Sequence, residues 1–270
     1  MSPTLFVFSA LLCEAKPLIV RWKLKKWQGK HPFAIYANAE RIVVVTGMGK
    51  VLMAGAMGYV LSLFPNRRLP VLINLGIAGH GQHDLGSLFL VDKIMDKDSG
   101  KNFYPQLPFN FRDKTTALLT LSKPESRYIE NCLFDMEASA FYEMACKFSS
   151  IELIHCLKIV SDNAESSYLE INEDLVESWI TQNLDLIDNT IATLDSLRKK
   201  LPEPDIGFCQ DLLSQFHFTA SNAAKLRNLQ QRWHLMNPDC ELDWKALDAK
   251  NAKDLIAGLQ LKLAEQEFYL

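Results

Sequence analysis

Three acidic residues each follow a separate strand-like segment, and carboxyl groups in that position can act as general acids or bases. Glu14 lies within four residues of the strand-like run Leu5–Ala10, Glu137 follows the short apolar start of CLFDMEASAF, and Asp162 follows the apolar run Leu153–Val160. Ligands of open α/β sheets bind just outside the carboxyl ends of the strands. If these strands are parallel in one sheet, the three carboxyls converge on one edge, where they can exchange protons with a bound ligand.

The run Leu153–Val160 is rich in Ile and Leu and ends abruptly in Ser161-Asp162-Asn163. A continuous apolar run of this length is typical of a strand that is buried on both faces, as in a parallel sheet. An alternative interpretation is that Asp162 only caps the following segment. The recurrence of an acid after the other two strands favours a site.

Strand-like and helix-like segments alternate over the first 200 residues. This alternation predicts an α/β fold of three layers, α/β/α, with a central mixed, mostly parallel sheet. The segments that support it are strands at Arg41–Thr46, Pro70–Gly76 and Leu88–Ile94, a glycine turn at Gly47-Met48-Gly49, a helix at Lys50–Phe64, a loop at Asp96–Phe111 and one long helix at Asn172–Lys200.

The character of the chain changes at Leu201-Pro202-Glu203-Pro204, because the following residues show helical periodicity and no good strand. We therefore predict two domains, an α/β domain over residues 1–200 and an all-helical extension over residues 205–270. The clearest helices of the extension are Ala220–Met236 and Asn251–Phe268. We interpret its aromatic residues as core, namely Phe208, Phe216, Phe218, Trp233 and Trp244.

Composition limits the classes of function. Of 270 residues, 48% are hydrophobic, which supports a folded core, and the net charge of −3 gives no reason to expect a nucleic-acid partner. Six cysteines show no CxxC or metal-type spacing, and no apolar stretch is long enough to cross a bilayer. His80 and His83 lack a third metal ligand nearby. We expect a soluble, cytoplasmic protein that uses no metal and no organic cofactor.

Five stretches resemble the nucleoside phosphorylase/nucleosidase family, and within it the 5′-methylthioadenosine/S-adenosylhomocysteine nucleosidase branch. They are ALLCEAKPLI at Ala10–Ile19, TGMGKVLMAGAM at Thr46–Met57, INLGIAGHG at Ile73–Gly81, FDMEASAF at Phe134–Phe141 and IVSDNAE at Ile159–Glu165. The resemblance covers residues 3–197. Its most specific part is DMEA followed about two dozen residues later by VSDNA.

This resemblance implies cleavage of the N-glycosidic bond of a purine nucleoside. Asp162 matches the acid that protonates purine N7, and Ser161 beside it orients the carboxyl. Glu137 matches the glutamate that binds the ribose hydroxyls, while Met136 packs against the sugar. Glu14 matches the acid that orients the attacking water. The reaction itself requires groups of these types. Glycosidic cleavage passes through an oxocarbenium-like state, which needs a general acid at the leaving group and a carboxylate near the developing positive charge.

The chain also departs from the family pattern around a second predicted glycine turn, formed by Gly76, Ala78, Gly79 and His80, where we place Gly76 and Ile77 beside the substrate. Phosphorylases have an arginine where this chain has Asn74, so water is the expected nucleophile. Ile77 stands where nucleosidases have a small hydroxyl residue, and its side chain narrows the expected pocket. The segment after Leu121 is shorter than the base-binding loop of the family, so the aromatic residue that stacks on adenine is not assigned, and Tyr128 is a weak candidate.

The favoured hypothesis is a nucleosidase acting on a 5′-modified adenine nucleoside, such as methylthioadenosine, S-adenosylhomocysteine or 5′-deoxyadenosine. One alternative is a phosphate-dependent purine nucleoside phosphorylase. Another is a nucleoside-binding module with weakened catalysis that recruits a protein partner through residues 205–270. The resemblance also implies a homo-oligomer.

Overall fold

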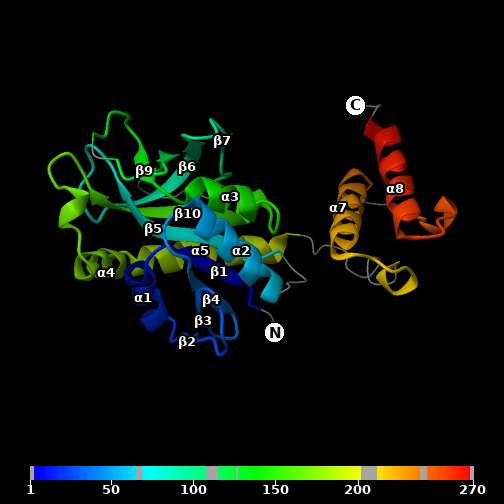
Figure 1. The fold of residues 1–270 in the computed structure, drawn as a ribbon, viewed down its shortest axis with the longest axis horizontal. Coiled ribbons are helices and arrows are strands. Elements are labelled where there is room, and N and C mark those ends of the chain that lie inside the picture. Colours follow the sequence, from blue (N-terminus) through cyan, green and yellow to red (C-terminus); the bar gives the residue numbers. More distant parts are fainter. Residues whose placement is uncertain are drawn as a thin grey trace. The chain divides into compact units, whose positions relative to one another are not determined.

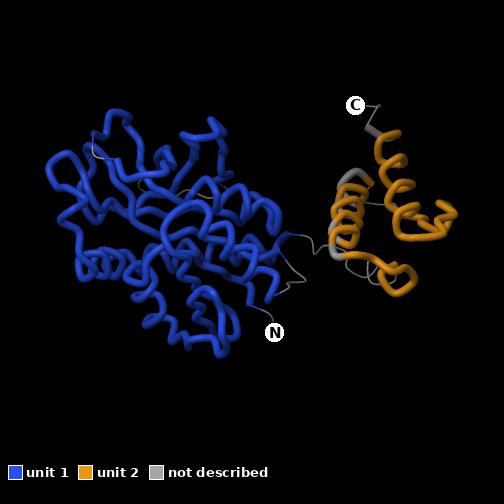
Figure 2. Tube along the Cα trace, in the orientation of Figure 1, with its two compact units in different colours: residues 1–202 blue, residues 203–270 orange. Residues whose placement is uncertain are grey.

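The computed structural model describes residues 3–64, 69–107, 115–125, 127–201, 212–237 and 242–267. The chain divides into two compact units, Met1–Pro202 and Glu203–Leu270 (Figure 2). Part of the expected 96–111 loop and the aromatic residue Phe208 lie outside the described residues. The two units are described separately.

The first unit is built around one mixed sheet, and helices pack against this sheet (Figure 1). Its strands are β1 Leu5–Ser9, β2 Lys25–Lys26, β3 Ala34–Ala37, β4 Arg41–Val45, β5 Val71–Gly79, β6 Leu88–Asp96, β7 Asn102–Phe103, β8 Thr115–Thr120, β9 Leu133–Asp135 and β10 Ile154–Asp162. Its helices are α1 Leu12–Arg21, α2 Lys50–Leu63, α3 Ala138–Ala145, α4 Glu173–Gln182 and α5 Leu184–Lys200, with 3-10 turns at Ile151–Leu153 and Tyr168–Glu170.

The sheet closes on itself. Its hydrogen-bonded order is β10-β6-β8-β9-β5-β1-β4-β3-β2, and β10 also pairs with β5, so β5, β10, β6, β8 and β9 form a ring. Among the described strands, five pairings are parallel and five are antiparallel. The predicted α/β class with a mixed sheet is confirmed, whereas "mostly parallel" does not describe these pairings and the closed ring replaces a simple central layer.

Apolar side chains pack on both faces of the sheet, as expected for strands that are buried on both sides. One core cluster joins the sheet to α2 and α3 and includes Met53, Met57 and Phe141. A second joins it to α1, α4 and α5 and includes Leu18 and Ile187. The long helix predicted over residues 172–200 is in fact two helices.

The break between α4 and α5 falls at Asn183. Its side-chain amide donates to the backbone oxygens of Gly86 and Trp179, each at 2.9 Å. Asparagine competes with helical backbone hydrogen bonds in this way, which makes it a common site of interruption.

The second unit has its own apolar core. It contains α7 Ala220–Met236, a 3-10 turn at Lys245–Leu247 and α8 Ala252–Glu267. The buried residues of this core are Leu212, Leu226, Leu229, Leu242, Leu255, Ile256, Leu259 and Leu263. Phe216, Phe218, Trp233 and Trp244 pack against them, as predicted for the described aromatic residues.

Candidate active site

The candidate site begins at a gap in the ladder of β5. One edge of β5 pairs with β1 only from Val71 to Asn74 and with β9 only at Gly79, while β10 pairs along the other edge. Between these two partners the backbone of β5 needs other hydrogen-bond partners. The hydroxyl of Ser9 donates to the Leu75 oxygen at 2.8 Å, and the Ile77 amide donates to Glu14 Oε1 at 2.9 Å. The gap therefore places an acid against the middle of the strand.

Glu14 is held firmly in this gap. It lies in the first turn of α1, and its Oε2 accepts a hydrogen bond from the Leu11 amide at 2.8 Å, which satisfies one free donor of the helix start. Its exposed fraction is 2%. Burial raises the pKa of Glu14, against the lowering effects of the Leu11 and Ile77 amides and of Lys158.

Glu137 reaches the same place by a route that the sequence did not predict. The three strands that precede the acids are not all parallel, because β9 runs antiparallel to β5 with Phe134 opposite Gly79. The chain beyond Phe134 therefore turns back along β5, and Glu137 follows two residues after the end of β9, at the start of α3.

The carboxylate of Glu137 accepts a hydrogen bond at 2.6 Å from the Gly49 amide at the start of α2. Burial and then the charge of Asp135 raise the pKa of Glu137 to about 7, while Lys158 and the Gly49 amide act in the opposite direction. The charge of Glu14 also raises this pKa.

Sequence reasoning missed Lys158, the cation at the centre of the site. Its Nζ lies 2.9 Å from Oδ2 of Asp135, and the two side chains are 2% and 0% exposed. Burial opposes the lysine charge, but Asp135 and Glu137 outweigh it and raise the pKa of Lys158. A lysine inside an apolar strand that is buried on both faces was a visible signal, because a buried charge needs a partner.

Asp162 lies farther along β10 and has a different set of partners. Its Oδ1 accepts a hydrogen bond from Ser161 Oγ at 2.5 Å, as the resemblance implies for a serine that orients the carboxyl. Its Oδ2 accepts a hydrogen bond from the phenol of Tyr128. Gly79 lies directly against this carboxyl, since a Cβ on Gly79 would come 2.5 Å from Asp162 Oδ2.

Gly76 and Ile77 take unequal parts in the site. A Cβ on Gly76 would lie 2.9 Å from Glu14 Oε1 and 3.4 Å from Lys158 Nζ, so only glycine fits there without displacing them. Side chains alternate between the faces of a strand, and the Ile77 side chain packs with the core cluster of α1, α4 and α5. Ile77 thus contributes its backbone amide, and its side chain points to the face opposite Gly76.

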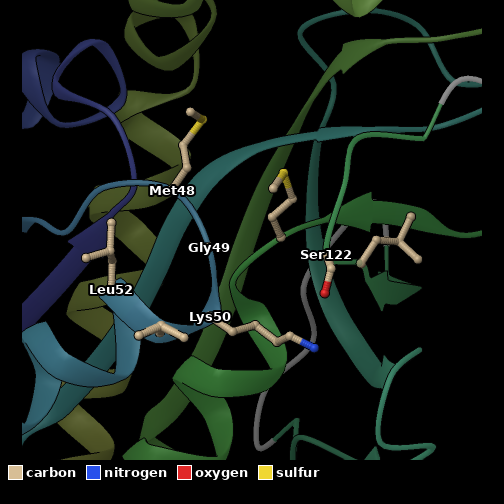
Figure 3. A pocket seen from close by; sticks show the side chains of 8 residues that line it. Met48, Gly49, Lys50, Leu52 and Ser122 are labelled. Atoms are coloured by element: carbon tan, nitrogen blue, oxygen red, sulfur yellow. The ribbon is translucent and has the colours of Figure 1, made fainter.

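A pocket of about 310 Å³ opens beside Glu137, at the start of α2 (Figure 3). Met136 belongs to its wall. The complete lining is Met48, Gly49, Lys50, Val51, Leu52, Leu121, Ser122 and Met136. In Figure 3 the side chain of Lys50 extends toward Ser122, and both side chains bond to Asp98.

A polar network connects this pocket to Lys158. Lys50 Nζ lies 2.9 Å from Asp96 Oδ2, which also accepts from Ser139 Oγ at 2.6 Å. The Ser139 amide donates to Thr120 Oγ1, and that hydroxyl donates to Asp135 Oδ1. Since Asp135 pairs with Lys158, both cations of the site are matched by acids.

The two histidines after β5 form a local structure of their own. His80 Nδ1 accepts from the amides of Gln82 and His83, and the two imidazole rings stack with centroids 3.9 Å apart. Burial lowers the pKa of His80 to about 4. Within the described residues no group of three or more His, Cys, Asp or Glu side chains is arranged to hold a metal ion. No helix in the described part of the chain is both long enough and apolar enough to span a bilayer.

Comparisons with known proteins agree on the fold. No protein-family model and no curated protein matches the chain. Among solved structures, the 5′-methylthioadenosine nucleosidase of Arabidopsis thaliana in apo form is 17% identical, with a TM-score of 0.53, over 76% of this chain and 99% of that one.

Two Helicobacter pylori structures are similar to the same degree. The 5′-methylthioadenosine/S-adenosylhomocysteine nucleosidase with butyl-thio-DADMe-Immucillin-A is 14% identical, over 70% of this chain and 99% of that one, with a TM-score of 0.54. Futalosine hydrolase is 15% identical over the same shares, with a TM-score of 0.53. The first unit therefore has the fold of the nucleoside phosphorylase/nucleosidase family, and the resemblance predicted from the sequence is confirmed at the level of fold.

Proposed function

We propose that this protein is a nucleosidase that hydrolyses the N-glycosidic bond of a 5′-modified adenine nucleoside. The observation that supports this most is the convergence of Glu14, Glu137 and Lys158 at the gap in β5, next to a pocket walled by Met136. A carboxylate cluster suits the positive charge that develops on the sugar during glycosidic cleavage. In this proposal Glu14 orients the attacking water, while Glu137 and Met136 hold the ribose.

Asp162 is the proposed proton donor to the departing base, oriented by Ser161. It lies near Gly79, three residues along β5 from Gly76, which is roughly 10 Å at the rise of an extended strand. A nucleoside can bridge such a separation, with its sugar near Glu137 and its base near Asp162. The pocket beside Glu137 would then accept the 5′ substituent, and its methionine and leucine side chains suit an apolar one.

Water is favoured over phosphate as the nucleophile by the charge balance of the site. Lys158 faces Asp135, Glu137 and Glu14, and Lys50 is paired with Asp96 and Asp98. These acids already match both cations, so a phosphate dianion would meet no unmatched positive charge there. This argument counts against the alternative phosphorylase activity.

Release of adenine tests the proposal. The purified protein is incubated in phosphate-free buffer with methylthioadenosine, S-adenosylhomocysteine or 5′-deoxyadenosine, and free adenine is measured by chromatography. We expect turnover without phosphate, and a loss of about 10²–10⁴-fold in kcat for Asp162→Asn, the range typical of a general acid. Asp84→Asn, at an exposed aspartate, is the control. Equal release by wild type and Asp162→Asn would refute the role of Asp162.

A further inference from the structure

Tyr128 covers the carboxyl group that we assign as the proton donor. Its phenol bonds to Oδ2 of Asp162, while Ser161 Oγ bonds to Oδ1. The exposed fraction of Asp162 is 6%. Both carboxylate oxygens of Asp162 therefore already accept hydrogen bonds from side chains of this protein. The lining of the pocket beside Glu137 includes neither Asp162 nor Tyr128.

The end of β5 is shaped to accept the tyrosine. A Cβ on Gly79 would lie 2.9 Å from Tyr128 Cε1, and a Cβ on Gly81 would lie 3.0 Å from Tyr128 Cβ. Glycine at both positions lets the aromatic side chain lie against the strand end. The ring of Phe134 completes the contact in an edge-on arrangement with its centroid 5.9 Å away.

The backbone around Tyr128 is suited to rearrangement. The residue lies between β8 and β9, outside regular structure, with a φ of 45° that bulky side chains rarely adopt. Its neighbour Ile129 is 80% exposed, so this side chain adds no core packing that movement would have to break. A residue with a strained backbone persists where surrounding contacts hold it in place. For Tyr128, the polar contact of this kind is the hydrogen bond to Asp162.

We propose, on the basis of the proposed function, that Tyr128 is a gate residue, a side chain that must leave Asp162 before a purine base can reach it. The resting chain thus has its general acid capped by a phenol. When a base binds, the phenol leaves with its own proton, and Asp162 takes up a proton from solvent and donates it in a hydrogen bond to a ring nitrogen of the base. The gate favours ligands whose base both fills the space of the tyrosine ring and offers a nitrogen to the acid.

The phenol is a dependable cap near neutral pH. Burial, and next the hydrogen bond to Asp162, raise the pKa of Tyr128, so the hydroxyl keeps its proton and acts as the donor.

Binding of adenine to the full chain tests the gate. Tyr128→Phe keeps the ring but removes the donor, and Tyr104→Phe, at a tyrosine that is 66% exposed, is the matched control. A closed gate reduces the fraction of protein molecules that can bind adenine, so removal of the hydrogen bond should lower the Kd for adenine. The expected decrease is about tenfold, as for the loss of a hydrogen bond to a charged group. Isothermal titration calorimetry measures the three dissociation constants, and Tyr104→Phe should match wild type.

Hydrogen exchange of the wild type gives a second measurement that needs no variant. Adenine should increase exchange of the backbone amides of residues 127–131, because their anchor is displaced. Unchanged or weaker binding by Tyr128→Phe, or greater protection of this segment with adenine, would overturn the gate, while adenine release from nucleosides still supported the proposed function. If neither wild type nor Tyr128→Phe bound adenine and no nucleoside were cleaved, the proposed function would fail, and the gate with it.

Discussion

The ammonium group of Lys158 lies 2.9 Å from the carboxylate of Asp135, and both side chains are almost fully buried. Asp135 has further donors, since it accepts hydrogen bonds from Thr120 Oγ1 and the Ala138 amide, each at 2.8 Å. Removal of two charges from water is costly, and a buried pair offsets that cost only when such hydrogen bonds complete it. The pair therefore joins β9 to β10.

Lys158→Met should strongly destabilise the first unit, because it leaves the buried carboxylate of Asp135 without its cation. The expected loss is about 3–5 kcal/mol in the free energy of unfolding, measured by urea denaturation. The double variant Lys158→Met/Asp135→Asn removes both charges and should lose less than Lys158→Met alone. A double variant that is as unstable as the sum of the two single variants would contradict the pairing.

The protonation of Glu137 should make stability depend on pH. Its pKa rises from an ordinary 4.5 to about 7 in the folded chain, so between these values the folded chain holds a proton that the unfolded chain releases. This contribution is fully present below about pH 4.5 and is lost as the pH rises toward 7. The stability of wild type relative to Glu137→Gln should therefore fall over this interval, by on the order of 2 kcal/mol.

Urea titrations of both proteins at several pH values between 4.5 and 7.5 measure this difference. A difference that stays constant, or that grows with pH, would show that Glu137 is ionised throughout. Glu143→Gln, at an exposed glutamate of α3, is the control for changes in general surface charge.

Gly76→Ala should impair turnover, because the added methyl would lie 2.9 Å from Glu14 Oε1 and must displace it. We expect a loss of at least about tenfold in kcat/KM, which corresponds to about 1.4 kcal/mol of transition-state stabilisation. Gly55→Ala in α2 is the matched control, since its methyl would come no closer than 3.7 Å to Phe33 and alanine favours a helix. Normal turnover by Gly76→Ala would contradict the proposal that Glu14 orients the attacking water.

Local patterns were sufficient to predict β1, β4 and the glycine turn Gly47-Met48-Gly49 before α2, but the glycine turn predicted from Gly76 to His80 was wrong, because β5 continues through Gly79. Strand β1, strand β4 and helix α2 lie within one residue of the predicted bounds, because apolar runs and glycine turns are local features. The ring closure and the reversed direction of β9 depend on pairings between residues far apart in the chain, which no local pattern specifies. The convergence of Glu14, Glu137 and Asp162 was predicted on the assumption that the three preceding strands are parallel, which is incorrect for β9.

Other parts of the site required the structure. The partner of Lys158 is Asp135, in a strand of three residues, and the position of Tyr128 depends on an irregular segment between β8 and β9. Ile77 was expected to narrow the pocket, but the alternation of the strand directs its side chain to the opposite face. The homo-oligomer and the protein partner of residues 205–270 stay predictions.

Removal of residues 203–270 tests the prediction that the chain has two domains. The described core residues of the second unit all belong to that unit, so the first unit should keep its own cores without it. The truncated chain should unfold in urea with the same midpoint as the corresponding transition of the full chain, and it should release adenine at the same rate. A lower midpoint would show that the helical unit stabilises the first, whereas normal stability with lost turnover would assign the helices a part in catalysis.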